Sequence, residues 1–228
     1  MSRILLIRHG QASFMKKNYD QLSDLGQQQS VKLGQWLSEK SINPELLFSG
    51  TLRRQQDTCR LSIGESRPPT INTSFNEHEG PVIFKAYFPT YLSEKPSLAE
   101  EIETKGMQDP TIRPQLIKAF FQMHHLWTQG KVESGEHESW QAFKLRAQEA
   151  YEVVLSAAEE GSVAVYTSGG LIASILGIVL GLKDDKVVDI NWQIRNTSIT
   201  ELKLSAGRLH LREFNSTPHL SIDEVTYV

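Results

Sequence analysis

An arginine and a histidine stand together near the start of the chain, directly after four apolar residues. Arg8 and His9 follow the apolar run 4–7 and precede Gly10. Such a run is typical of a short strand buried on both faces of a parallel sheet. Ligands of open α/β sheets bind at the carboxyl ends of the strands. Neutral imidazole is a nucleophile near pH 7 and arginine binds anions through a planar fork, so the pair indicates chemistry on an anion.

Two further segments are predicted to end at the same crevice. The apolar run 46–48 precedes the segment 49–54, which contains two arginines, and the run 162–167 precedes the Ser-Gly-Gly sequence at 168–170. Arginines bind phosphate through two hydrogen bonds, and a glycine turn that opens a helix exposes N–H groups to an anion. This combination fits a phosphoryl group. Its transfer also needs a carboxylic acid to protonate the leaving oxygen, and Glu77 is the best candidate.

The elements that position these residues alternate between strands and helices. Ser23 or Asp24 is expected to cap a helix that reaches about residue 39, and Thr51 is expected to cap a second helix that ends at 63. Further helices are predicted at 110–127, 139–160 and 171–180, and a terminal hairpin at 197–204 and 208–214. Repeated strand, turn and helix units indicate a mostly parallel sheet, and the hairpin provides an antiparallel edge strand.

The segment 78–135 stands apart because it is irregular in pattern apart from its one predicted helix. We expect a single domain over residues 1–228, with about 78–135 inserted as a lid or cap that sets the substrate. Four polar or charged side chains in this segment are expected to face either the pocket or the solvent: Lys85, Tyr87, Tyr91 and Lys95.

Composition excludes several classes of function. The 24 Lys and Arg residues against 27 Asp and Glu residues give a formal charge of -3, so no general basic field indicates nucleic acid or an anionic membrane as a partner. No apolar run is long enough for a signal-peptide core or a membrane span. We expect a cytoplasmic protein that acts on a small substrate.

Cysteine and histidine usage argues against a metal site. Cys59 is the only cysteine, which excludes an internal disulfide and a multi-cysteine metal site, and we expect it to be a small core residue. No cluster of His, Cys and carboxylate residues has metal-ligand spacing, so we expect no metal and no cofactor.

Eight short segments extend these motifs over nearly the whole chain. They are residues 6–11, 22–29, 49–58, 76–77, 135–136, 167–170, 196–199 and 219–220. In this order and spacing they resemble the histidine phosphatase superfamily, also called phosphoglycerate mutase-like. The resemblance implies a three-layer α/β/α fold of that type. It also implies His9 as the phospho-accepting nucleophile and Glu77 as the general acid and later base. Arg8 and Arg54 would form the phosphate clamp, and Arg53 would point elsewhere, into solvent.

One position departs from the family pattern. The family usually has a second histidine before the Gly-Gly pair, where this chain has Ser168. A serine gives one neutral donor in place of a charge-assisted one, so about half of the bond strength is lost. Loss of one oxyanion donor typically costs ~10²–10³ in rate. We expect Ser168 and Gly169 to bind phosphate in an enzyme of low activity, and capping of the following helix is the alternative role for the serine.

Three functions fit these residues. The first is a metal-independent phosphatase that hydrolyses a phosphomonoester through a phosphohistidine on His9, with Glu77 as the acid or Glu79 in its place. The second is a weak or inactive homologue that binds a phosphorylated metabolite or protein. The third is a phosphoglycerate-type mutase, which Ser168 weakly disfavours because it makes the pocket less positive. The sequence does not identify the substrate or the oligomeric state.

Overall fold

Contacts within the chain divide it into two compact units. The computed structural model describes residues 2–13, 20–132, 135 and 137–227. One unit consists of residues 1–77 and 145–228, and the other of residues 78–144. The predicted insertion at 78–135 corresponds to most of the second unit.

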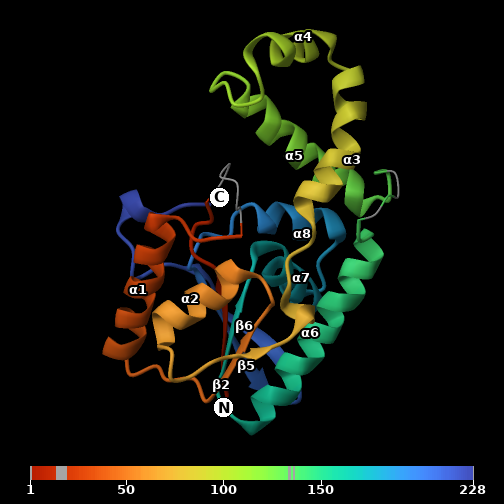
Figure 1. The fold of residues 1–228 in the computed structure, drawn as a ribbon. Coiled ribbons are helices and arrows are strands. Elements are labelled where there is room, and N and C mark those ends of the chain that lie inside the picture. Colours follow the sequence, from red (N-terminus) through yellow and green to blue (C-terminus); the bar gives the residue numbers. More distant parts are fainter. Residues whose placement is uncertain (1, 14–19, 133–134, 136, 228) are drawn as a thin grey trace. The chain divides into compact units, whose positions relative to one another are not determined.

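The first unit is built on a six-stranded sheet with the order β3-β2-β4-β1-β5-β6 (Figure 1). Its strands are β1 (Arg3–Arg8), β2 (Leu46–Ser49), β3 (Thr70–Ile71), β4 (Val163–Thr167), β5 (Ile199–Ser205) and β6 (Arg208–Ser216). The first four strands in this order run parallel, whereas β5 is antiparallel to β1 and β6 to β5. The predicted mostly parallel sheet with an antiparallel edge is confirmed. The short β3 is not among the strands predicted from the sequence.

Helices cover both faces of this sheet. They are α1 (Asp24–Glu39), α2 (Arg53–Ile63), α6 (Trp140–Glu160), α7 (Gly169–Leu180) and α8 (Asp184–Asn191), and two short 3₁₀ turns are η1 (Thr73–Phe75) and η2 (Ile222–Glu224). In Figure 1, α1 and α2 lie on one side of the strands and α6 and α7 on the other. The three-layer α/β/α fold is therefore confirmed.

Burial of the central strands explains why the sheet forms. Every residue of β4 is buried, and so are residues 4–7 of β1. Leu5 and Ile7 of β1 pack with Leu33 of α1 and Cys59 of α2 in one apolar cluster. Removal of such side chains from water is the main favourable term in folding. Burial raises the pKa of the Cys59 thiol to about 12, so this cysteine is an unreactive core residue, as expected.

The two predicted helix caps have different outcomes. The Ser23 hydroxyl accepts a hydrogen bond from the N–H of Gly26 at 3.0 Å, so the predicted cap of α1 is confirmed. The prediction that Thr51 caps α2 is wrong, because the Thr51 hydroxyl is bonded to the side chain of Asn76. The first N–H of α2, that of Arg53, donates to a distant carboxylate, which is described below.

The second unit is helical, so the prediction of an irregular segment was wrong. It contains α3 (Gly80–Ser93), α4 (Pro96–Lys105), α5 (Arg113–Thr128) and the first turn of α6. A proline occupies the first turn of each of these three helices, where its missing N–H costs nothing. Tyr87 and Tyr91 are 5% and 0% exposed, so they form the interior of this unit and do not face solvent. Lys85 is exposed, and the Lys95 ammonium lies 4.9 Å from the centre of the Tyr91 ring.

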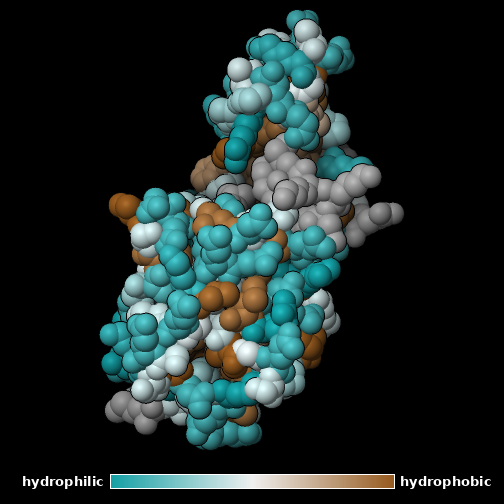
Figure 2. All heavy atoms as spheres, turned by 60° about the vertical axis from the view of Figure 1, so that its left-hand side comes forward, coloured by the Kyte–Doolittle hydropathy of each residue, from teal (hydrophilic) through white to brown (hydrophobic). Residues whose placement is uncertain are grey.

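Within the described ranges, no helix is both long and apolar enough to cross a bilayer. On the face drawn in Figure 2, hydrophilic residues predominate and apolar residues occur in small groups.

Candidate active site

The backbone of His9 is held from two sides. Its N–H donates to the carbonyl of Thr167 at the end of β4, at 2.9 Å. Its carbonyl accepts from the N–H of Thr197 and from the side-chain amide of Asn196, each at 3.2 Å. His9 is only 5% exposed. The end of β1 is therefore fixed between β4 and the segment that leads into β5.

Hydrogen bonds also orient the imidazole of His9. Its Nδ1 lies 2.7 Å from the carbonyl oxygen of Gly10, and its Nε2 lies 3.2 Å from Nε of Arg54. A carbonyl oxygen only accepts and a guanidinium only donates, so Nδ1 carries the proton and Nε2 carries the lone pair. Burial, followed by the charges of Arg54 and Arg8, holds the pKa of His9 well below its ordinary value. The ring is therefore neutral at pH 7, with a nucleophilic nitrogen beside Arg54.

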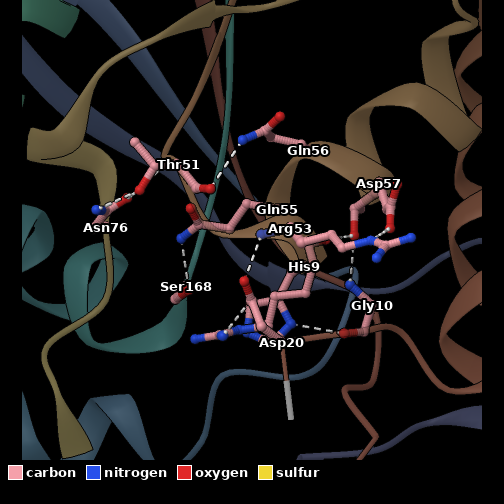
Figure 3. A network of polar contacts seen from close by, with 12 residues as sticks. His9, Gly10, Asp20, Thr51, Arg53, Gln55, Gln56, Asp57, Asn76 and Ser168 are labelled. Carbon is pink, nitrogen blue, oxygen red and sulfur yellow. Dashed lines mark hydrogen bonds and ion pairs between the residues drawn. The ribbon is translucent and has the colours of Figure 1, made fainter. Parts of the chain in front are cut away.

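Asp20 holds Arg54 in this position. The Arg54 Nη1 lies 2.8 Å from Oδ1 of Asp20. The backbone N–H of Arg53 donates to Oδ2 of Asp20 at 2.9 Å (Figure 3). One carboxylate thus caps α2 and fixes the buried guanidinium on its first turn. The Arg53 side chain is 62% exposed and pairs with Asp57 at 3.4 Å. Asp20 was missed by sequence reasoning, because it is distant in sequence from the helix that it caps.

Glu77 reaches the site from the segment that follows η1. Its Oε2 accepts from the N–H of Gly170 at the start of α7, at 3.0 Å. Its charge acts on His9, where it raises the pKa against the larger lowering effects of burial and arginine. Glu79 is exposed, occupies the position before α3 and belongs to the other unit. Of the two candidate acids, Glu77 is the one that lies in the same unit as His9.

Arg146 on α6 holds the segment that carries Glu77. Its Nη1 donates to the carbonyl of Asn76 at 2.6 Å, and its Nη2 to the carbonyl of Glu77 at 3.4 Å. The Asn76 side chain in turn accepts from the N–H of Thr51 at 2.7 Å. This part of the chain is thereby tied to α6 and to the loop before α2. Sequence reasoning did not single out Arg146.

Ser168 and Gly169 form the start of α7. Ser168 is the residue before the helix, but among the described residues its side chain accepts no hydrogen bond from the helix backbone, so the capping alternative is wrong. Its hydroxyl accepts instead from Nε2 of Gln55 at 2.8 Å, a residue that the sequence analysis did not single out. A Cβ on Gly169 would lie 2.6 Å from Oδ1 of Asn191 and 3.7 Å from Nε of Arg8. Glycine is needed at 169 for this close approach.

Arg8 lies at the other side of His9. Its Nη1 donates to the carbonyl of Tyr227 at 2.7 Å and to that of Ile194. Its charge lowers the pKa of His9, as stated above. Arg8 therefore supplies positive charge to the site while its Nη1 holds two backbone carbonyls.

Together these residues make an arrangement that is suited to binding and attacking a phosphoryl group. The neutral, buried imidazole of His9 has its unprotonated nitrogen hydrogen-bonded by one fixed guanidinium and lies near a second. The carboxyl group of Glu77 lies at the start of α7. In the part of the chain that the structure describes, no group of three or more His, Cys, Asp or Glu side chains is placed to hold a metal ion.

Comparison with known proteins identifies the family. The model of the histidine phosphatase superfamily (branch 1) matches residues 4–82 and 89–217. The chain belongs to this superfamily. The resemblance seen in the sequence is thus confirmed, although Glu136, part of one of its motifs, lies outside the described residues.

Curated relatives match only part of the chain. Phosphoglycerate mutase 1 of Saccharomyces cerevisiae is 32% identical over 69 residues, which are 28% of this chain and 28% of that protein. The 2,3-bisphosphoglycerate-dependent phosphoglycerate mutase of Methylorubrum populi is 32% identical over 84 residues, which are 34% of this chain and 40% of that protein. The matches therefore span less than half of each relative.

Solved structures share the fold over almost the whole chain. A mutant of phosphoserine phosphatase from Entamoeba histolytica, in complex with phosphoserine, superposes with a TM-score of 0.64 at 17% identity, covering 97% of this chain and 100% of that one. The mycobacterial glucosyl-3-phosphoglycerate phosphatase with inorganic phosphate gives 0.64 at 21% identity, with 97% and 100% covered. The α-ribazole phosphatase of Shigella flexneri gives 0.61 at 18% identity, with 94% and 96% covered.

Proposed function

We propose that this protein is a phosphatase that hydrolyses small phosphomonoesters through a phosphohistidine on His9, without a metal ion. The observation that carries the proposal is the state of the imidazole. Its Nδ1 proton is held by Gly10, its pKa is lowered, and its Nε2 lone pair lies 3.2 Å from Nε of Arg54. Attack on an anionic ester requires an unprotonated nucleophile beside a fixed cation, and Nε2 can form the bond to phosphorus once Arg54 turns its hydrogen bond from Nε2 to a phosphoryl oxygen.

The reaction has two steps. In the first, Glu77 has taken up a proton as the anionic substrate binds. Nε2 of His9 forms a bond to phosphorus, the ester P–O bond breaks, and Glu77 gives this proton to the leaving oxygen. The resulting imidazolium keeps its Nδ1 proton on the carbonyl of Gly10. In the second step water attacks phosphorus and gives its proton to the Glu77 carboxylate, the N–P bond breaks, and phosphate leaves. Arg8 and Arg54 offset the charge on the phosphoryl oxygens in both steps.

The proposal includes a role for the inserted segment. We propose that the segment of about 78–135 is a cap that selects the organic part of the substrate, because the proposed nucleophile, acid and arginines all lie outside it. Two relatives are named phosphoglycerate mutases, so isomerisation of a phosphoglycerate is the alternative reaction to test beside hydrolysis.

A single experiment tests the nucleophile. The protein is mixed with an aryl phosphate in the presence of a chelator. The release of the phenol is followed over time. Samples are also quenched rapidly and tested for phosphohistidine, which is labile in acid and stable in alkali. We expect a burst of phenol, phosphohistidine at His9 and slow turnover, all absent in His9→Ala. His210→Ala, which changes an exposed histidine on β6, is the matched control and should behave as the unaltered protein.

Each alternative predicts a different result. Full turnover by His9→Ala would overturn the mechanism. Binding of phosphate esters without any phosphohistidine would identify a binding homologue. Conversion of a monophosphoglycerate into its isomer, in place of free phosphate, would identify a mutase.

A further inference from the structure

Gln55 is a buried polar residue of α2 whose contacts the mechanism above does not use. It is 0% exposed, and its Nε2 donates to the Ser168 hydroxyl at 2.8 Å and to the carbonyl of Phe75 at 3.1 Å (Figure 3). Its Oε1 has no hydrogen-bond partner among the described residues. A buried amide with an unsatisfied oxygen costs stability compared with an apolar side chain of the same size. A buried amide that destabilises the fold in this way is expected where the amide has a function.

The Phe75 carbonyl fixes which way the amide faces. If the amide were reversed, Oε1 would lie against the carbonyl oxygen of Phe75, and two acceptors would repel each other. Gly50 makes room for Oε1, because a Cβ there would lie 2.1 Å from this atom. Nε2 is therefore the atom that faces Ser168, and both of its protons are used.

This orientation determines what the Ser168 hydroxyl can do. The oxygen accepts from Gln55, so the hydroxyl proton points to some other acceptor. Ser168 follows β4 just as His9 follows β1, and the parallel register pairs Arg8 with Thr167, so the two residues lie side by side. A phosphoryl group on Nε2 of His9 would present oxygen atoms that can accept this proton.

We propose that Gln55 is a positioning residue that aims the Ser168 hydroxyl at a phosphoryl oxygen during transfer. This inference rests on the proposed phosphatase function. The pair takes the place where the family usually has a second histidine, and it supplies a donor that carries no charge. Because neither group titrates, the donor remains available at every pH at which His9 is neutral.

Three variants and one control test the pair. Ser168→Ala removes the donor, Gln55→Leu removes its orienting partner, and the double variant removes both. Gln56→Leu is the matched control, because this neighbouring glutamine donates to the carbonyl of Thr51 at 2.9 Å. Gln55→Leu should fold, since the Phe75 carbonyl still accepts from the Thr167 hydroxyl at 2.6 Å and an unsatisfied oxygen is lost. Urea unfolding checks this.

The measurement is kcat for an aryl phosphate, divided by the phosphohistidine burst amplitude so that only active molecules count. We expect a loss of ~10²-fold in Ser168→Ala and of about tenfold in Gln55→Leu. The double variant should match Ser168→Ala, and KM and the shape of the pH profile should not change. Gln56→Leu should match the unaltered protein.

The outcomes distinguish the role of Gln55 from the proposed phosphatase function. Phosphohistidine in the unaltered protein, with unchanged kcat per active site in Gln55→Leu, would overturn the role of Gln55 and leave the phosphatase in place. Additive losses in the double variant would do the same. Absence of phosphohistidine in the unaltered protein would overturn both.

Discussion

At the scale of single residues, two adjacent arginines have opposite surroundings. Arg54 is 7% exposed and contacts His9 and Asp20, whereas the Arg53 side chain is 62% exposed and pairs with Asp57. The difference follows from their place on α2, where consecutive residues point about 100° apart. Of these two arginines, only Arg54 contacts the imidazole of His9.

Replacement of Arg54 by Gln should change both rate and pH dependence. Without this fixed cation, we expect kcat/KM to fall by ~10²–10³. The Arg54 charge lowers the pKa of His9, so removal of this charge raises the pKa of His9 towards 6.5. The acid limb of the pH profile then moves to higher pH. Arg53→Gln is the control, with rate and profile unchanged. The pH dependence of kcat/KM with an aryl phosphate tests this, and two identical profiles would contradict it.

Residue types predicted part of the site, and their surroundings could only come from the structure. His9 and Arg8 stand out because their chemistry is unusual directly after an apolar strand, and Glu77 stands out because the predicted transfer needs an acid. Asp20 does not, since its role depends on a contact with a helix start 33 residues away. Gln55 carried a signal, because it stands four residues before Cys59 and therefore on the same face of α2.

At the scale of elements, the site depends on a segment without regular structure. Residues 76 and 77 follow η1 and include Glu77, the proposed general acid, and Arg146 on α6 holds their carbonyls. Hydrophobic periodicity predicted α1, α6 and the hairpin because each has a clear apolar face. Periodicity failed for α3 and α4, because their apolar and charged residues stand in consecutive groups and do not alternate with the period of a helix.

Replacement of Arg146 by Met should allow Glu77, the proposed general acid, to move from its position without removing its carboxyl group. Small displacements of a catalytic group cost up to ~10²-fold, so we expect kcat to fall by about tenfold to a hundredfold while KM stays nearly constant. Arg208→Met, at an exposed position on β6, is the control. Steady-state kinetics with an aryl phosphate measure both constants. An unchanged kcat would show that Arg146 does not position Glu77.

At the scale of the whole molecule, buried histidines make stability depend on pH. Burial lowers the pKa of His219 from 6.5 to about 4. Its Nε2 lies 2.9 Å from the hydroxyl of Thr197, which donates its own proton to Asn196, and its Nδ1 has no partner among the described residues. Protonation would leave a buried N–H unsatisfied, so the folded state resists it.

The sign of this effect is testable. Below pH 6.5 the unfolded chain binds a proton at His219 that the folded chain does not bind, so the free energy of unfolding falls as pH drops towards about 4. The full shift corresponds to about 3 kcal/mol. His219→Gln should lose less stability over this range, and the exposed His210→Gln should follow the unaltered protein. Urea unfolding from pH 7 to 4 measures the free energy of unfolding. Curves of this free energy against pH that are parallel for all three proteins would contradict the role of His219.

The last described residues contact the first strand at the site. Gln29 donates to the carbonyl of Glu224 at 2.8 Å and to the hydroxyl of Thr226, which bonds the same Asn196 side chain that holds His9. The carbonyl of Tyr227 accepts from Arg8. The segment around His9 is thus held by residues far from it in the sequence.

This arrangement makes the surroundings of His9 depend on residues 224–227. A chain arrested on the ribosome at residue 227 keeps these residues in the exit tunnel, away from Arg8 and Asn196. We expect chains arrested at this residue to lack the proposed phosphatase activity and to gain it when they are released. Chains with a long flexible linker between residue 227 and the arrest point should be active while still bound. Residue 227 must therefore have left the tunnel before the surroundings of His9 are complete.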